Sequence, residues 1–365
     1  MSRSTPLREV HERLGATLTD FAGWLMPLRY GSESAEHAAV RTAAGLFDLS
    51  HMGEIYLTGP KAGEALDYAL VGHISALEPG RARYTMICAP DGGIVDDLIV
   101  YRLANEKFMV VANASNRETV ARELIERCPD AVVEDRSDQC ALVAVQGPRS
   151  QEILAALTDA DLPGLKYYAG LPGVVAGHEA LIARTGYTGE DGFELFVDAA
   201  AAVPLWQALT EAGEPYGLRP AGLSARDTLR LEAGMPLYGN ELTAETTPFD
   251  AGLGRVVKFD KPGDFVGRQA LEKRRAVEES SRRLVGLVSR GRRVPRHGYH
   301  VVKDGAVIGE VTSGAPSPTL GRPIAMAYVS AAALADGTGE GLAVDIRGNH
   351  EPVDLVDLPF YRRTK

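Results

Sequence analysis

The sequence predicts an α+β protein with two ferredoxin-like units of the split β-α-β type and a small C-terminal β-barrel. A strand, a Gly-Pro pair and an amphipathic helix occur twice, with Gly59-Pro60 and Gly147-Pro148 as the anchors. Short strand-like runs then follow at regular spacing from Arg282 to Tyr361, which is typical of a small barrel. The 365 residues, 45% of them hydrophobic, suffice for two or three packed units.

Two helices are predicted before the repeat. Thr5-Pro6 is typical of a helix start and Gly15 of a helix end. Residues 34–44 predict a second helix that Gly45 ends, and the run LFDLSHMGEIYLTG then leads into a strand.

The two halves of the repeat continue in a similar way. In the first, strands fold about Asp91-Gly92-Gly93, a third strand FMVVAN follows, and Ser115 begins a helix. In the second, two strands fold about residues 188–192 and a helix ends near Gly213. Both halves show β-α-β-β with a following helix, so we infer a duplicated architecture.

The run GGIVDDLIVY, residues 92–101, places Asp96 and Asp97 in a strand that is otherwise apolar on both alternation phases. Neighbouring side chains in a strand point to opposite faces, so the two carboxylates cannot serve one site. An unpaired buried carboxylate costs several kcal/mol or becomes neutral. Either such an acid bonds the backbone of the adjacent turn, or it has a function.

Glu194 favours the functional interpretation. The strand GFELFV, which follows the second turn, also holds one acid among apolar residues. We therefore expect that two related strands each bury a carboxylate. Burying a carboxylate costs free energy, and a purely structural role would rarely require this twice, so a functional role is favoured.

The run AGLSARDTLRLEAG predicts a helix with apolar residues at a period of 3.6 and Gly234 as its cap. Arg226 and Arg230 share one face of it. They are either a surface pair or a rigid grip on a planar heterocycle or a carboxylate. The loop that follows contains Tyr238.

The composition indicates in which compartment the protein is expected and which classes of partner are not expected. The longest apolar run, residues 199–206, is broken by Pro204 and too short to span a bilayer, so no membrane partner is expected. The first fifteen residues lack the apolar core of a secretory signal, which favours a cytoplasmic protein. The net charge of −10 disfavours nucleic acid, and the scattered cysteines and histidines predict no metal site.

Positive charge is concentrated in one segment. Residues 268–296 hold ten Lys or Arg against three acids, a net charge of +7. This segment is either a solvated helix followed by a basic loop, or a docking surface for an acidic ligand or protein.

The sequence resembles the T-protein (aminomethyltransferase) family of the glycine cleavage system over essentially its whole length. The segments that carry the resemblance, in order, are FAGWLMPLRY, GLFDLSHMG, GGIVDDLIVY, RTGYTGEDGFEL, ARDTLRLEAGMPLYGNEL and VTSGAPSPTLGRPIAMAYV. The family resembled has three domains in a cloverleaf around a folate site. Its reaction takes the aminomethyl group from the lipoyl arm of the H-protein, releases ammonia and leaves methylenetetrahydrofolate.

On this resemblance we expect four parts of the chain. Residues 1–50 and 133–255 form a first, folate-binding α+β domain and residues 51–132 a second. Residues 256–281 form a linker with a helix around residues 268–277, and residues 282–365 form the barrel. Tetrahydrofolate is the expected co-substrate and lipoylated H-protein the expected partner.

Carried over residue by residue, the resemblance places the essential acid of the family at Asp97. It places the pterin-binding carboxylate at Glu194 and a folate-contacting arginine at Arg226, and Asp96 then takes a structural role. Further positions that match the lining of the folate pocket are Met52, Tyr84, Val111, Asn113, Tyr187 and Tyr238.

The chemistry agrees with these assignments. A reduced pterin offers N–H donors that a buried carboxylate such as Glu194 can accept in paired bonds, and aromatic side chains flank such rings. The transfer is expected to pass through an iminium as ammonia departs. A fixed anion such as Asp97 would stabilise that cation, a role we favour over proton abstraction because the attacking ring nitrogen is already a nucleophile.

Two other readings stay open. One is a free-standing tetrahydrofolate-dependent demethylase. The other is a non-catalytic folate-binding protein, whose linker carries a Lys-Gly-Cys type motif; the run KFDKPGDFVGRQ here has no cysteine. The family often has further aromatic residues at its C-terminal end, so a folate contact by Tyr361 or Arg362 is also left open.

Overall fold

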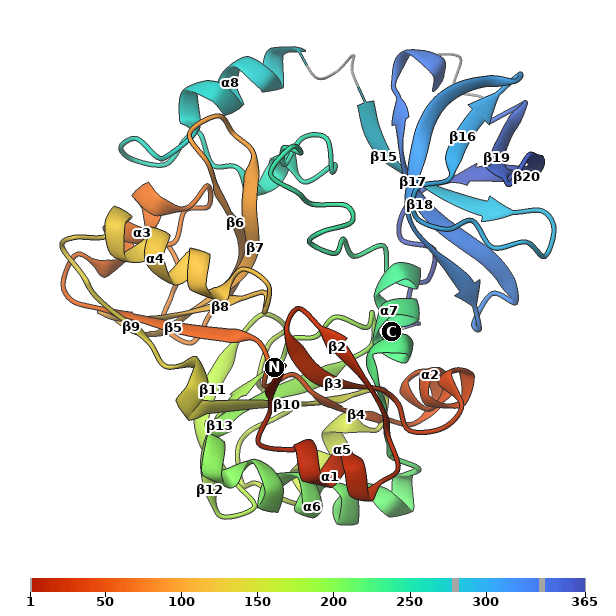
Figure 1. Ribbon diagram of the computed structural model, residues 1–365. Helices are drawn as coiled ribbons and strands as arrows, with labels where there is room; N and C mark the ends of the chain where they lie inside the picture. The colour runs from red at the N-terminus through yellow and green to blue at the C-terminus, as the bar shows by residue number, and fades with distance from the viewer. Residues whose placement is uncertain (1, 278–281, 335–338, 365) are drawn as a thin grey trace. The chain divides into compact units, whose positions relative to one another are not determined.

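The computed structural model describes residues 2–277, 282–334 and 339–364 (Figure 1). Residues 278–281 of the expected linker therefore lie outside the described residues. Contacts divide the chain into two compact units. Unit 1 comprises residues 1–69, 73–85 and 98–227, and unit 2 comprises residues 70–72, 86–97 and 228–365. Among the described residues, no helix has the length and apolar character needed to cross a membrane.

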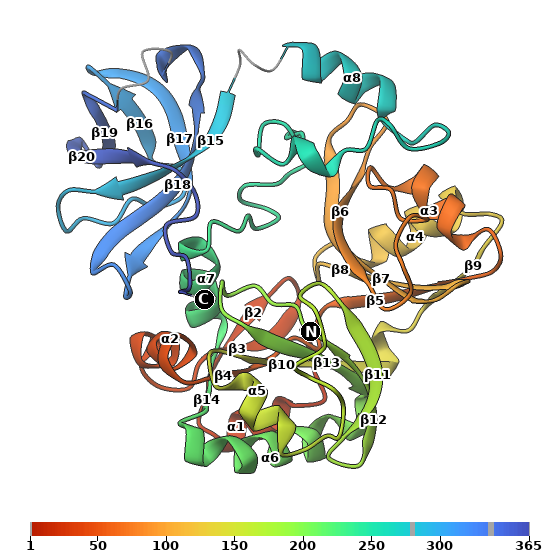
Figure 2. The same cartoon turned by 180° about the vertical axis from the view of Figure 1, so that it is seen from behind.

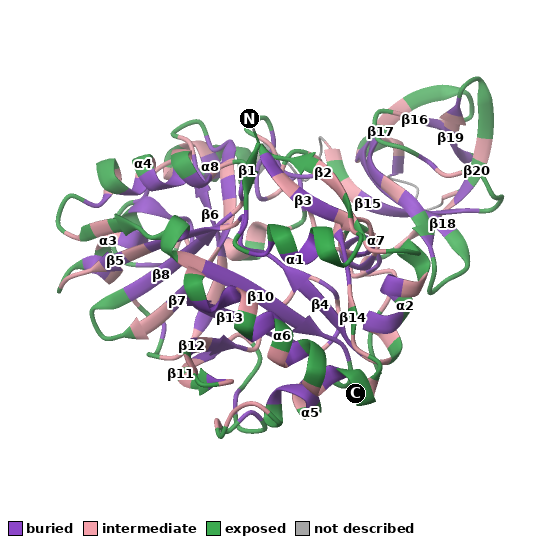
Figure 3. Cartoon of the chain, turned by 60° about the horizontal axis from the view of Figure 1, so that its bottom comes forward, coloured by how far each residue is buried: buried purple, intermediate pink, exposed green. Residues whose placement is uncertain are grey.

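A six-stranded sheet organises unit 1, with the strand order β11-β12-β13-β10-β4-β14. Its strands are β4 (Gly45–Asp48), β10 (Cys140–Gln146), β11 (Gly170–Val175), β12 (His178–Ala183), β13 (Gly192–Asp198) and β14 (Arg219–Pro220). The central strands β10 and β13 are antiparallel, with Ala144 opposite Glu194. Both are buried along most of their length, as the apolar runs predict (Figure 3).

Three helices cover one face of this sheet: α1 (Arg8–Arg13), α5 (Ser150–Ala155) and α6 (Ala202–Gly213) (Figure 2). Val10, Ile153 and Trp206 from these helices pack with Val143 and Leu195 of the sheet in one buried cluster. This apolar layer packs against one face of the sheet and so holds β13, the strand that contains Glu194, in place.

The N-terminal part contains a small sheet that the sequence analysis did not predict. Its strands are β1 (Arg3–Ser4), β2 (Thr17–Phe21) and β3 (Trp24–Arg29), in the order β1-β3-β2. Ala22 and Gly23, both at positive φ, form the turn between β2 and β3. Both expected helices are present, as α1 and as α2 (Glu33–Thr42), which Ser32 caps.

A second sheet has the strand order β6-β7-β8-β5-β9. Its strands are β5 (Gly53–Thr58), β6 (Ala82–Cys88), β7 (Ile94–Ala104), β8 (Lys107–Ala112) and β9 (Val132–Asp135), and its helices are α3 (Ala62–Ala69) and α4 (Arg117–Arg127). The division between the two units runs through β6 and β7, so the hairpin tip at residues 86–97 belongs to unit 2.

The structure confirms the duplication and corrects its alignment. Each half runs strand, helix, three strands, helix, and the strand orders β6-β7-β8-β5 and β11-β12-β13-β10 match. Strand β11 was not expected from the sequence, because Gly170, Pro172 and Gly173 disfavour a strand. With β11 in place, the strand of Glu194 corresponds to β8 and not to β7. The inference that two related strands each bury a carboxylate is therefore wrong.

The predicted C-terminal barrel of unit 2 is confirmed. It closes in the order β15-β18-β17-β16-β19-β20. The strands are β15 (Arg282–Ser289), β16 (His300–Lys303), β17 (Ala306–Ser317), β18 (Arg322–Ser330), β19 (Leu342–Ile346) and β20 (Asn349–Val356). Leu287, Val311 and Val344 pack in its core. Asp304 and Gly305, both at positive φ, make the expected hairpin turn.

Two further helices are α7 (Leu223–Glu232) and α8 (Arg268–Val277), both as expected from the sequence. Short 3-10 turns cover residues 137–139, 199–201, 214–216, 254–256 and 332–334. The interpretation of Arg230 as a surface residue is wrong, because this side chain is 1% exposed. Its guanidinium donates to Glu241 Oε2 and to Ser313 Oγ, each at 2.8 Å, which ties the end of α7 to strand β17.

Replacing Glu241 by alanine tests this buried ion pair. The change removes the carboxylate to which the buried Arg230 guanidinium donates, and such a loss costs about 3–5 kcal/mol of unfolding free energy. Urea unfolding followed by circular dichroism should show this loss. Glu12→Ala, which removes the exposed partner of Arg8, should cost less than about 1 kcal/mol. Equal losses of unfolding free energy in the two variants would contradict the expectation that the buried ion pair contributes more than the exposed one.

Candidate functional site

Strand β7 separates its two adjacent carboxylates, as alternation predicts. Asp96 is fully buried, on the same face as Ile94, whereas Asp97 is half-buried on the face of Ile99. Tyr238, from the loop after α7, donates its hydroxyl to the Ile94 carbonyl at 3.1 Å. Burial raises the pKa of Tyr238, and both carboxylates add to that rise. This part of unit 2 therefore joins Tyr238 to the strand that holds the two acids.

In unit 1, Glu194 lies in the middle of β13 and is 8% exposed. The Thr185 hydroxyl donates to Glu194 Oε2 at 2.5 Å. Because that hydroxyl has one proton, the Tyr101 hydroxyl donates in turn to Thr185 Oγ1, at 2.8 Å. Burial raises the pKa of Glu194, although Thr185 and the Arg226 charge oppose the rise. Glu194 is thus a buried acid whose ionised form is disfavoured by its loss of water.

Arg226, on α7, faces this acid from the same unit. Its guanidinium carbon lies 4.7 Å from the ring centroid of Tyr187. Burial lowers the pKa of Arg226, while Glu194 and Tyr187 oppose the change. The start of α7 is fixed by Glu36, whose Oε2 accepts the Gly222 N–H at 2.9 Å. The functional interpretation of Arg226 therefore gains a rigid helix and a stacked aromatic partner.

The loop that carries Tyr187 is held by Gln146 at the end of β10. Gln146 Nε2 donates to the Thr185 carbonyl at 3.0 Å, and its Oε1 accepts the Thr188 hydroxyl at 2.9 Å. A Cβ atom at Gly186 would lie 2.0 Å from Gln146 Oε1, so a larger residue there would have to displace this amide. The geometry of this loop thus depends on the side-chain amide of Gln146, which is buried against it.

A buried ion pair holds the same loop from α2. Arg41 Nη1 donates to the Thr188 carbonyl at 2.7 Å and to Glu190 Oε1 at 3.0 Å. Neither Arg41 nor Gln146 was expected from the sequence to have a role. No local pattern could reveal Arg41, because its partner Thr188 is 147 positions away in the chain.

His51 is a further residue that the sequence analysis did not name. It follows β4, its ring is 2% exposed, and it packs edge-on against Phe21 at 5.7 Å between centroids. Burial lowers the pKa of His51 to about 4; the Arg226 charge acts in the same direction and Asp48 against it. The imidazole is therefore neutral at physiological pH. Its Nδ1 is buried, and no group among the described residues bonds to it.

Four other predicted positions lie on unit 1. Met52 follows β4, Tyr84 is on β6, Val111 is on β8 and Asn113 follows β8. Val111 is 7% exposed and the other three are half-buried. Their contact with the cluster of Glu194 and Arg226 stays a prediction.

At the C-terminal end of the described residues, the Tyr361 N–H donates to the Glu232 carbonyl at 2.8 Å, and Arg362 is exposed. This ties Tyr361 to α7 through its backbone. A folate contact by either residue stays open.

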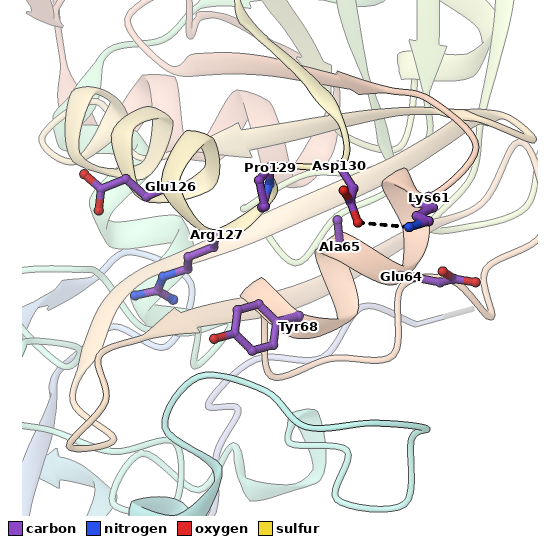
Figure 4. A pocket seen from close by; sticks show the side chains of 8 residues that line it. All are labelled: Lys61, Glu64, Ala65, Tyr68, Glu126, Arg127, Pro129 and Asp130. Carbon is purple, nitrogen blue, oxygen red and sulfur yellow. Dashed lines mark hydrogen bonds and ion pairs between the residues drawn. The ribbon is translucent and has the colours of Figure 1, made fainter.

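Two surface hollows lie away from the predicted residues. One, of about 500 Å³, lies between α3 and α4, and Lys61 pairs with Asp130 at its rim (Figure 4). The other, of about 690 Å³, is in unit 2 and lies beside the parallel rings of Phe249 and Phe259. None of the predicted site residues lines either hollow.

The raised pKa of Glu194 predicts how stability depends on pH. The unfolded chain loses this proton near pH 4.5, and the folded chain loses it only at higher pH. The protonated form therefore contributes stability below pH 4.5 that is lost as pH rises through the folded pKa. Glu194→Gln should remove this loss, so its melting temperature relative to wild type should rise between pH 4 and pH 8.

The exposed Glu179→Gln on β12 is the control, and its melting temperature relative to wild type should not change with pH in this way. A Glu194→Gln profile parallel to that of wild type would show that the burial of Glu194 does not favour its proton.

Comparison with known proteins identifies the family. A family model described as the GCVT N-terminal domain matches residues 7–261, and one described as the glycine cleavage T-protein C-terminal barrel domain matches residues 282–362. The aminomethyltransferase of Streptomyces coelicolor is 70% identical over all of this chain and 98% of its own length. That of Bacillus subtilis is 44% identical over the full length of both chains.

A solved structure agrees with these matches. The crystal structure of the glycine cleavage system aminomethyltransferase T from Bartonella henselae covers the whole of both chains with a TM-score of 0.92 at 37% identity. The chain therefore belongs to the T-protein family of the glycine cleavage system, the family of the aminomethyltransferases.

Proposed function

We propose that the chain moves the aminomethyl carbon from the lipoyl arm of H-protein to tetrahydrofolate in the cytoplasm, giving methylenetetrahydrofolate and ammonia. The observation that carries this proposal is the unit 1 cluster of a buried acid, Glu194, and an arginine, Arg226, stacked on Tyr187. Family membership supports the reaction, and the chemistry of this cluster supports a folate site there.

The donor set of the cluster fits a reduced pterin. Glu194 can accept N–H groups of the heterocycle, and its ionised form would then gain the bonds that burial denies it. Tyr187 offers a flat apolar surface and Arg226 a planar set of donors beside it. Because Gln146 and Arg41 hold the loop of Tyr187, this surface is in place before a ligand arrives.

We assign the catalytic role to Asp97 and a structural role to Asp96. Asp97 lies on the half-buried face of β7, and Asp96 is fully buried on the other face. When ammonia leaves the aminomethyl group, positive charge develops on the carbon that is transferred. A fixed carboxylate near that charge stabilises it and holds the attacking nitrogen in position.

The remaining assignments rest on the resemblance. We propose that the folate pocket is lined by Met52, Tyr84, Asp97, Val111, Asn113, Tyr187, Glu194, Arg226 and Tyr238. The first, folate-binding domain is assigned to residues 1–50 and 133–255, the second to residues 51–132, the linker to 256–281 and the barrel to 282–365.

Ammonia release tests the function directly. Purified protein with aminomethylated, lipoylated H-protein should release ammonia at least tenfold faster when tetrahydrofolate is present. The control is the same mixture without the protein. Ammonia release that does not respond to folate would contradict the proposed transfer. Methylenetetrahydrofolate formed from an N-methylated amino acid in place of H-protein would instead favour a demethylase.

Asp97→Asn tests the assignment of the two acids. Loss of the fixed charge should lower turnover by about 10²–10³-fold, as for other preorganised groups that stabilise a transition state, while folate still binds. Steady-state kinetics and folate titration measure the two effects separately. The neighbouring Asp96→Asn should lower stability more than turnover. If Asp96→Asn abolished turnover and Asp97→Asn did not, the two roles would be reversed.

A further inference from the structure

His51 is a buried residue of unit 1 whose ring is influenced by the charge of Arg226. Its imidazole is 2% exposed, yet Nδ1 lies buried with no hydrogen-bond partner among residues 2–277, 282–334 and 339–364. Buried polar atoms of folded proteins almost always have a partner, so each exception requires a physical explanation. The packing of the ring against Phe21 explains where the ring lies but leaves Nδ1 unsatisfied.

A second buried histidine of unit 1 shows what a structural imidazole looks like in this fold. His11 is fully buried, and both of its ring nitrogens are satisfied. Its Nε2 lies 2.9 Å from Asp48 Oδ2, and its Nδ1 lies 2.8 Å from the Tyr30 hydroxyl. Thr5 donates to the same Asp48 oxygen at 2.6 Å. This network is complete without His51, although His51 lies close enough to Asp48 to respond to its charge.

The neighbours of His51 indicate what it binds. The Arg226 charge acts on its ring, and Met52, a predicted wall of the folate pocket, is the next residue in the chain. A neutral imidazole has one N–H donor and one acceptor nitrogen. It therefore suits a ligand edge that presents N–H and C=O groups, such as that of a reduced pterin.

We propose that His51 is a further binding residue, whose Nδ1 hydrogen-bonds to the reduced pterin of tetrahydrofolate held by Glu194 and Arg226. This inference rests on the proposed function, because it takes the folate to lie in that cluster. The free protein leaves the bond unmade, and the ligand completes it. His51 thus adds affinity only when the ligand is present, which a structural residue does not do.

Four variants test the proposal by titration with tetrahydrofolate under anaerobic conditions and by thermal unfolding of the free protein. His51→Leu should weaken folate binding about three- to tenfold, the usual range for one neutral hydrogen bond. It should leave the melting temperature of the free protein unchanged or higher, because it removes an unsatisfied buried polar atom.

His51→Asn and His51→Gln provide the rescue. The asparagine amide can place a polar atom near the position of Nδ1, and the glutamine amide near that of Nε2. His51→Asn should therefore restore most of the affinity and His51→Gln less of it. Buried His37 on α2 is the matched control. His37→Leu should lower the melting temperature and leave folate binding unchanged.

Nitrogen-15 NMR of the imidazole gives a second readout. Addition of tetrahydrofolate should shift the His51 Nδ1 resonance and leave those of His11 in place. The proposal is overturned if His51→Leu binds folate as tightly as wild type, or if Nδ1 does not shift, as when only a buried water bonds to it. If the wild-type protein binds no folate, that result contradicts the proposed function. It can be distinguished from a result that contradicts only the role of His51, in which the wild-type protein and His51→Leu bind folate equally well.

Discussion

The burial of one carboxylate, that of Glu194, is the constraint on which the candidate site of unit 1 depends. A strand that is apolar on both sides can hold an acid only if neighbouring groups compensate the loss of water. Thr185 and Tyr101 supply a chain of hydroxyl donors, and Arg226 supplies positive charge. The compensation is incomplete, since the pKa of Glu194 remains raised. The fold therefore compensates the charge of this acid only in part.

Helix α7 shows how similar residues acquire different roles. Arg226 and Arg230 lie one turn apart in one amphipathic pattern. Arg230 is fixed by Glu241 and Ser313 and serves the fold. Arg226 has an aromatic partner, Tyr187, and a nearby acid, Glu194, and it is the arginine to which we assign folate binding. The spacing of the two arginines in the sequence shows only that they share one face of the helix. It does not show which residues each of them contacts, so it could not assign them different roles.

Two histidines likewise have different surroundings although the sequence does not distinguish them. His11 and His51 are both buried near Asp48, and nothing in their local sequence separates them. Only the placement of Tyr30 and Asp48 shows that His11 is fully satisfied. Polar satisfaction depends on neighbours brought from distant segments, so it cannot be read from local periodicity. The same reason hid Gln146 and Arg41, whose partners lie on the loop of Tyr187.

The sequence by itself determined the α+β class, the barrel, most helices and the fact that Asp96 and Asp97 face apart. These features follow from local periodicity and turn chemistry, which need no knowledge of distant residues. The tertiary structure alone decided which acid is fully buried, added β11, and showed that the strand of Glu194 corresponds to β8. Strand pairing and burial are long-range properties, and a strand with Gly170, Pro172 and Gly173 is specified by its neighbours and not by its own residues.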